Sequence, residues 1–137
     1  MKSNIKAVWQ GNFKEGKGQF NNENSKLDTI TFKPSFAKND GSFTNPEELL
    51  ASAHASCYTM TLSYILSESG FSADNLETKI ALEMENNVIT RSNLILQAKI
   101  PAITAEKFQE IAIKAKGMCP VGNALSVEVS LEASLIQ

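Results

Sequence analysis

Four residue types with distinctive chemistry are scarce in this chain of 137 residues, which contains two cysteines, one histidine, one arginine and one tryptophan. A structural zinc site takes four ligands, mostly cysteine and histidine side chains. The single histidine is His54, three residues before Cys57, and the second cysteine is Cys119. These three side chains are too few for such a site, so the sequence predicts no bound metal.

A strong charge of either sign is also missing. The chain has 13 basic and 15 acidic residues, a net charge of −2 and an isoelectric point near 5.4. Its lysines are scattered rather than grouped in blocks. Proteins that bind nucleic acids or anionic membrane surfaces normally present a concentrated basic patch. We therefore expect neither nucleic acid nor a membrane among the partners of this protein.

The sequence has no hydrophobic run long enough to cross a bilayer, which takes about 20 apolar residues. The most apolar segment, residues 44–70, is interrupted by His54, Ser56 and Glu68. No sequence of signal-peptide form opens the chain. These absences predict a cytoplasmic protein. In that compartment two cysteines are more often reduced, catalytic or redox-cycling than joined in a permanent disulfide.

The chain does contain one long helical segment, TNPEELLASAHASCYTMTLSYILSESG, around which we expect a single domain spanning residues 1–137. Asn45 is a good N-terminal cap, Pro46 fits the first helical position, and Glu48 occupies the acidic position of a capping box. Gly70 can adopt the left-handed conformation that ends a helix. The segment is predicted to form one unbroken helix of about 24 residues.

The apolar residues of this helix occupy more than one face. One set recurs at spacings of three and four residues, and a second set adds apolar surface on neighbouring faces. The first set is Leu49, Leu50, Ala53, Cys57, Met60, Thr61 and Tyr64, and the second is Leu62, Ile65 and Leu66. Such a helix must be covered on several sides, and the predicted strands are too few to do so. We therefore predict a homodimer in which a second copy covers the helix.

Alternating apolar residues on both sides of this segment predict β-strands. Three strands precede the helix, and a long hairpin with its turn at residues 86–87 follows it. Thr104 is the predicted cap of a second helix over residues 105–116, which Gly117 ends, and a helical turn over residues 119–125 precedes the last strand. Strand groups separated by helices are typical of the α+β class. The predicted strands cover residues 5–9, 19–22, 27–32, 76–84, 89–100 and 127–135.

Two motifs resemble those of a known family. TNPEELLASAHASCYTMTL opens the long helix and carries Cys57, and AKGMCPVGNAL follows the second helix and carries Cys119. They are similar to motifs of the osmotically inducible protein C and organic hydroperoxide resistance (OsmC/Ohr) family, more so to the OsmC branch. The resemblance covers essentially the whole chain. It implies an intertwined α+β homodimer in which two long central helices lie between antiparallel-rich sheets.

The resemblance further implies thiol-dependent reduction of organic hydroperoxides and hydrogen peroxide, without metal or organic cofactor. Transferred residue by residue, it makes Cys57 the peroxidatic cysteine, Cys119 the resolving cysteine and Glu47 the site carboxylate. The Cys57 thiolate would attack the peroxide and become a sulfenic acid, which Cys119 captures as a disulfide. An external dithiol, such as a lipoylated protein, would then reduce this disulfide. Backbone N–H groups at the start of the predicted turn would favour the Cys119 thiolate.

Each candidate also has a structural interpretation. A buried cysteine behaves as a small hydrophobe, and Glu47 would interact favourably with the helix dipole as a first-turn acid. His54 lies one helical turn from Cys57. It would either stabilise the thiolate as an imidazolium or act as a hydrogen-bonded packing residue, and we keep it as a supporting candidate.

The family pattern includes an arginine beside the reactive cysteine, which this chain lacks. At the two places that carry it in the family, this chain reads FKEG (residues 13–16) and FKPSF (residues 32–36), and its one arginine is Arg91. A lysine lacks the planar fork that binds a carboxylate and faces a thiolate together. The alternative is therefore a weakly active or non-catalytic relative that binds a small apolar ligand or senses oxidants through Cys57.

Glu47 and Cys57 are ten residues apart on the predicted helix, which corresponds to roughly 15 Å along its axis. A glutamate side chain cannot span that distance, and the good helix formers between the two residues favour an unbroken helix. If both residues belong to one site, Glu47 comes from the partner subunit. We therefore predict an obligate homodimer with shared sites.

Overall fold

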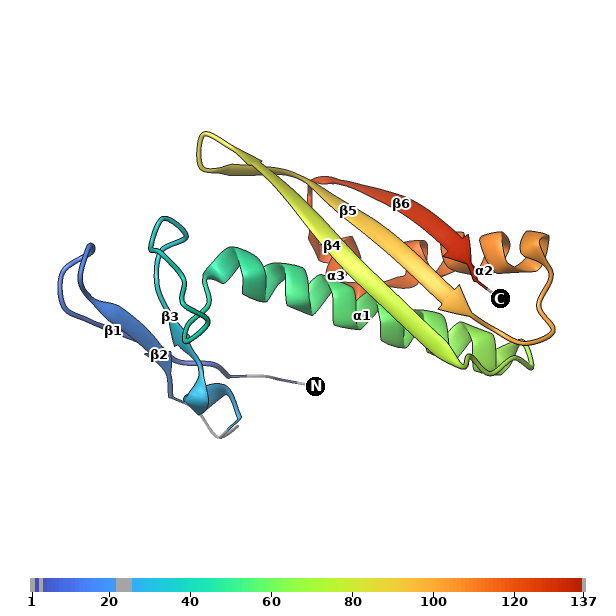
Figure 1. Ribbon diagram of the computed structural model, residues 1–137, viewed down its shortest axis with the longest axis horizontal. Coiled ribbons are helices and arrows are strands. Elements are labelled where there is room, and N and C mark those ends of the chain that lie inside the picture. The colour runs from blue at the N-terminus through green and yellow to red at the C-terminus, as the bar shows by residue number, and fades with distance from the viewer. Residues whose placement is uncertain (1, 3, 22–25, 137) are drawn as a thin grey trace. The chain divides into compact units, whose positions relative to one another are not determined.

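The structure, a computed structural model, describes residues 2, 4–21 and 26–136. It divides into two compact units, Met1–Leu50 and Ala51–Gln137. Helix α1 (Pro46–Glu68) starts near the end of the first unit and continues in the second (Figure 1). Helices and strands alternate in groups along the chain, which confirms the predicted α+β class. That the chain forms a single domain stays a prediction.

The first unit contains a three-stranded antiparallel sheet in the order β1-β2-β3. The predicted first hairpin is confirmed. Gly18 of β2 lies beneath the ring of Phe32, where an added Cβ atom would come within 2.2 Å of the ring carbons, so only glycine fits there. The rings of Trp9 and Phe20 pack beside Phe32, with centroids 6.1 and 5.0 Å away. The strands are β1 (Ala7–Gln10), β2 (Lys17–Phe20) and β3 (Thr31–Phe32).

The strand predicted over residues 27–32 is wrong in its first half. Leu27–Thr29 forms a short 3₁₀ helix, η1, and only Thr31–Phe32 pairs as a strand. The Thr29 hydroxyl donates a hydrogen bond to the Lys26 carbonyl at 2.8 Å, and such local bonds compete with strand pairing. The strand predicted over residues 19–22 lies earlier, as β2, and its last residue is outside the described part of the chain.

The second unit is built on a sheet of three strands in the order β4-β5-β6. The predicted hairpin of β4 (Asn75–Glu85) and β5 (Val88–Lys99) is confirmed. Asn86 and Asn87 form its turn with φ of 52° and 64°, the left-handed conformations that a two-residue hairpin turn requires. Strand β6 (Glu128–Leu135) pairs with β5 in parallel, so the chain must cross over between them.

Helices α2 (Ala105–Met118) and α3 (Pro120–Ala124) make this crossover. From Ser92 to Ala98 of β5 every second side chain is buried, because successive side chains point to opposite faces of a sheet. The second-unit part of α1 and helix α2 pack against that buried face. The core combines Tyr58, Leu62, Ile65 and Leu66 of α1, Leu94, Leu96 and Ala98 of β5, and Phe108, Ile111, Ala112 and Ala115 of α2.

The predicted helix ends are mostly confirmed. The Asn45 side chain accepts a hydrogen bond from the Glu48 N–H at 2.8 Å, and Gly70 has φ of 84° just after α1. Thr104 caps α2 through the Lys107 N–H at 3.1 Å. The prediction that Gly117 ends α2 is wrong. The helix continues to Met118, since a glycine with ordinary φ is tolerated inside a helix.

One face of α1 remains uncovered in the single chain. Leu62 and Leu66 of the second apolar set are buried, whereas Met60 and Tyr64 of the first set are 73% and 58% exposed. Large apolar side chains exposed on one helix face are typical of an interface.

In the described part of the chain, no helix is long and apolar enough to cross a membrane.

Candidate active site

The fold brings the two cysteines together in the second unit. Cys57 is half-buried in the middle of α1, and Cys119 is the residue between α2 and α3. The Val121 N–H donates to Cys57 Sγ at 3.5 Å, and the Gly122 N–H donates to Cys119 Sγ at 3.4 Å. Two consecutive amides of the first turn of α3 therefore point at the two sulfur atoms. Both cysteines are free thiols.

Cys119 is fully buried, and this sets its protonation state. Burial raises the pKa of the Cys119 thiol, and the neighbouring Cys57 side chain raises this pKa further. The hydrogen bond from the Gly122 N–H lowers it by less than burial raises it. The predicted amides are present and act in the expected direction, but desolvation outweighs them. Cys119 is therefore a thiol at neutral pH.

His54 lies on the same buried side of α1 and is 1% exposed. Its Nδ1 is 2.8 Å from Oγ of Ser92, a buried serine of β5. Its Nε2 is buried and has no hydrogen-bond partner among the described residues. Burial lowers the pKa of His54 below its usual value of 6.5, so the ring is neutral at pH 7. Burial thus disfavours the imidazolium that the sequence analysis considered.

Tyr58 is a structural member of the site that the sequence analysis did not identify. It directly follows Cys57, is 0% exposed, and donates a hydrogen bond from its hydroxyl to the Ala112 carbonyl of α2 at 2.9 Å. Burial, and then the nearby Cys119, raise the pKa of Tyr58, so its phenol stays protonated. The bond joins the helix that carries Cys57 to the helix that precedes Cys119. Its partner is a backbone carbonyl, which leaves no signal in the sequence.

Glu47 lies in the first turn of α1, outside the unit that holds the cysteines. One of its carboxylate oxygens, Oε2, is buried and has no hydrogen-bond partner among the described residues. Helix α1 continues from Glu47 to Cys57 without a break, as predicted. The two residues are thus separated by about three helical turns in one chain.

Comparison with known proteins places these residues in a family. The family model described as "OsmC-like protein" matches residues 39–134, which include both cysteines. The chain belongs to the OsmC-like family. It is 36% identical to the peroxiredoxin OsmC of Escherichia coli over 135 residues, which cover 94% of this chain and 93% of that protein. It is 27% identical to the organic hydroperoxide resistance protein OhrB of Bacillus subtilis, over 84% of this chain and 88% of the relative.

Solved structures support the same fold. An OsmC-like protein from Mycoplasma pneumoniae superimposes with a TM-score of 0.82 at 17% identity, covering 100% of this chain and 99% of the other. An organic hydroperoxide resistance protein from Elizabethkingia anophelis gives a TM-score of 0.74 at 23% identity, covering 99% of each chain. The α+β fold implied by the family resemblance is therefore confirmed.

The single arginine of this OsmC-like chain does not lie beside its cysteines. Arg91 of β5 forms ion pairs with Glu83 of β4 and Glu128 of β6. It directly precedes Ser92, whose side chain faces His54. Because neighbouring residues of a strand point to opposite faces, Arg91 lies on the far side of the sheet from α1. It cannot supply the arginine of the family pattern within its own chain.

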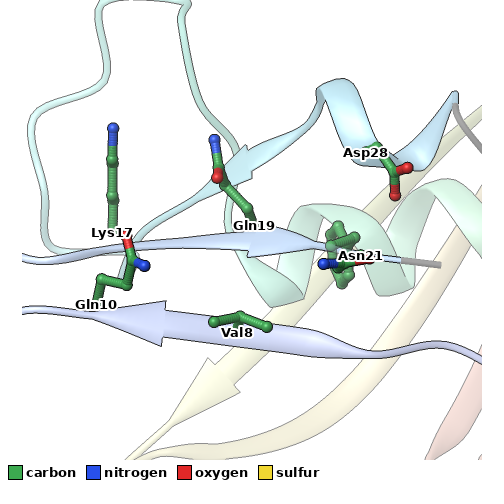
Figure 2. A pocket seen from close by; sticks show the side chains of 7 residues that line it. Val8, Gln10, Lys17, Gln19, Asn21 and Asp28 are labelled. Carbon is green, nitrogen blue, oxygen red and sulfur yellow. The ribbon is translucent and has the colours of Figure 1, made fainter.

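Two hollows of this OsmC-like chain lie away from the thiols. Figure 2 shows one of about 320 Å³ in the first unit, bordered largely by polar side chains of β1, β2 and η1, including Gln10, Gln19 and Asp28. A hollow of about 460 Å³ lies beside the C-terminal half of α1 in the second unit. Neither is lined by a cysteine. Within the described residues, no group of three or more histidine, cysteine, aspartate or glutamate side chains could hold a metal ion.

Proposed function

We propose that this protein is a thiol-dependent peroxidase that reduces organic hydroperoxides and hydrogen peroxide. The observation that carries the proposal is the pair of adjacent thiols of different character. Cys57 is half-buried, whereas Cys119 is fully buried. A peroxide therefore meets Cys57 before Cys119. The names of the relatives, a peroxiredoxin and an organic hydroperoxide resistance protein, support the same reaction class.

In the proposed reaction the Cys57 thiolate attacks one peroxide oxygen and the O–O bond breaks. Cys57 becomes a sulfenic acid, and an alcohol or water leaves after taking up a proton. The Val121 N–H points at Cys57 Sγ, at 3.5 Å. The Cys119 thiol then displaces the sulfenic oxygen as water and forms the Cys57–Cys119 disulfide. The two thiols supply both electrons, so this route requires no bound metal or organic cofactor.

An external dithiol completes the proposed cycle by thiol–disulfide exchange. The first attack falls on Cys57, since Cys119 is enclosed. A small dithiol, either dihydrolipoamide or the lipoyl group of a lipoylated protein, fits this restricted access. We place the cycle in the cytoplasm, where such reductants keep both thiols reduced between turnovers.

Titration with peroxide tests the proposal directly. One equivalent of cumene hydroperoxide should consume both free thiols and link Cys57 to Cys119 within one chain, as shown by peptide mass mapping. With dihydrolipoamide present, the protein should then consume peroxide catalytically. Bridges found only between chains, or Cys57 oxidised beyond the sulfenic acid while Cys119 stays free, would contradict the proposed resolving step.

A second candidate function is favoured by the position of Arg91. Because its ion pairs hold it on the far face of the sheet, the chain lacks a guanidinium near Cys57. A sensor, or a weakly active relative that binds a small apolar ligand, would need no such group. The same assay separates the two functions. Normal alkylation of Cys57 without peroxide turnover would support the second candidate.

We also propose that the active protein is an obligate homodimer and that Glu47 of the partner subunit completes each site. Three observations support this: the exposed Met60 and Tyr64 on α1, the Glu47 oxygen that has no hydrogen-bond partner among the described residues, and the unbroken helix between Glu47 and Cys57. Light scattering at micromolar concentration should give the dimer mass. A folded and active monomer would refute the proposal.

Mixed dimers test the sharing of sites. Glu47→Ala and Cys57→Ser homodimers should each be nearly inactive. When the two variants are unfolded together and refolded, half of the dimers combine both chains, and each has one intact shared site. The mixture should recover about a quarter of the wild-type activity. If each site takes both residues from one chain, the mixture stays inactive.

A further inference from the structure

His54 has an unused nitrogen beside the resolving cysteine. Its Nδ1 is fixed by Ser92 Oγ at 2.8 Å, while Nε2 is buried and unpartnered among the described residues. A Cβ atom added at Gly122 would lie 3.0 Å from Nε2 and 3.5 Å from Cys119 Sγ. Both atoms therefore border the same small space, which stays open because residue 122 is glycine.

The backbone donors of this region are already used. The Gly122 N–H points at Cys119 Sγ and the Val121 N–H at Cys57 Sγ. When Nδ1 carries the ring proton and donates it to Ser92 Oγ, Nε2 has a free lone pair. Leaving a buried polar atom unpaired costs free energy, which is a reason to look for a function.

The proposed reaction needs a proton acceptor at this place. Cys119 must lose its proton to attack Cys57, yet burial raises the pKa of the Cys119 thiol and it stays protonated at neutral pH. The Tyr58 phenol cannot accept the proton, because its hydroxyl is itself protonated and donates to Ala112. A neutral imidazole beside the thiol meets the requirement.

We propose that His54 Nε2 is the general base that takes the proton of the Cys119 thiol as this sulfur attacks oxidised Cys57. The Cys119 electron pair forms the S–S bond while the S–O bond of the Cys57 sulfenic acid breaks. Cys119 is oxidised and Cys57 is reduced, so the step needs no outside oxidant or reductant. His54 passes the proton to the departing hydroxide, which leaves as water. Ser92 is a positioning residue that holds the required tautomer.

The inference rests on the proposed function for its biological role, but its test does not require peroxide. Dithiodipyridine reacts first with the more accessible Cys57 and releases one coloured thiopyridone. Cys119 then attacks the Cys57 sulfur of the mixed disulfide and releases a second thiopyridone, in a separate absorbance phase. The Cys119→Ser variant, which should lack this second phase, assigns it.

The His54→Asn variant removes the base but keeps a side-chain amide able to reach Ser92. Its second phase should be slower than that of the wild type by about 100-fold or more, the usual contribution of general base catalysis. Added imidazole should restore part of the rate to His54→Ala, which a purely structural role would not allow. A second phase at the wild-type rate in a folded His54→Asn protein would overturn the inference.

The wild-type pH profile keeps the inference testable if both variants fail to fold. The other titratable side chains of the site are Cys119, Cys57, which is blocked in this assay, and Tyr58, which stays protonated. Burial lowers the pKa of His54 below 6.5, so the base is neutral and active from pH 7 to 9. The second-phase rate should be flat over that range. If the second-phase rate instead rises about tenfold per pH unit, the attacking species is a Cys119 thiolate formed by loss of its proton to solvent hydroxide. That result would refute the role of His54.

The two proposals can fail separately. A chain that forms no sulfenic acid with peroxide, yet shows the His54-dependent second phase, would lack the proposed peroxidase function while keeping the base. Conversely, the chain could reduce peroxide while its His54 variants form the disulfide at the wild-type rate. The protein would then be a peroxidase in which His54 has only a packing role.

Discussion

Replacing Cys57 with serine is expected to reduce peroxide consumption to the uncatalysed background. A serine hydroxyl cannot accept the peroxide oxygen as a thiolate does, so the first step has no nucleophile. Loss of the nucleophile in comparable enzymes lowers turnover by several orders of magnitude, and we expect at least about 1000-fold here. The measurement is the initial rate of cumene hydroperoxide loss with dihydrolipoamide in excess.

The matched control for this prediction is Cys119→Ser. It keeps Cys57 and should still consume the first equivalent of peroxide at a rate near that of the wild type. Without its resolving thiol, Cys57 should then accumulate as a sulfenic acid and advance to the sulfinic acid under excess peroxide. Activity that persists in Cys57→Ser but disappears in Cys119→Ser would reverse the assigned roles of the two cysteines.

Replacing Tyr58 with alanine should cause the largest loss of stability among the site variants. Tyr58 is completely buried between α1 and α2. Truncation of a buried aromatic residue leaves a cavity and costs about 3–5 kcal/mol. The variant should therefore unfold at a clearly lower urea concentration. It should also form the Cys57–Cys119 disulfide more slowly, because the helices that carry the two sulfurs are no longer held together.

The control here is Tyr58→Phe, which removes only the hydroxyl that donates to the Ala112 carbonyl. The expected cost is about 1 kcal/mol, the net contribution of a typical hydrogen bond. Both variants are compared at one protein concentration, since the stability of a dimer depends on it. An alanine variant no less stable than the phenylalanine variant would show that the ring does not join the two helices.

The sequence predicted the features that short segments determine. Asn45 and Glu48 are three residues apart, and their capping interaction follows from residue type and spacing. The two-residue hairpin turn at Asn86 and Asn87 follows for the same reason. The family motifs identified both cysteines, but their contact depends on how α1, α2 and α3 pack together.

The sequence could not show interactions between distant segments. His54 and Ser92 are 38 residues apart, and Tyr58 and Ala112 are 54 apart. Ser92 lies in a strand of alternating residues, where the sequence does not distinguish it from any other small polar residue. The net direction of the Cys119 pKa shift could not be predicted for a related reason. The turn that places amides near its sulfur is local, whereas the burial that raises its pKa comes from the whole fold.

The parallel pairing of β5 with β6 also determines when the site can form during folding. Helix α1 and the β4–β5 hairpin are built from local contacts, which form early. The crossover through α2 and α3 closes only when β6 joins β5, and closing such a long loop costs conformational entropy. On the ribosome Cys57 is synthesised well before Cys119 and β6. The newly made chain therefore carries the Cys57 thiol without Cys119 packed beside it until the last strand is in place.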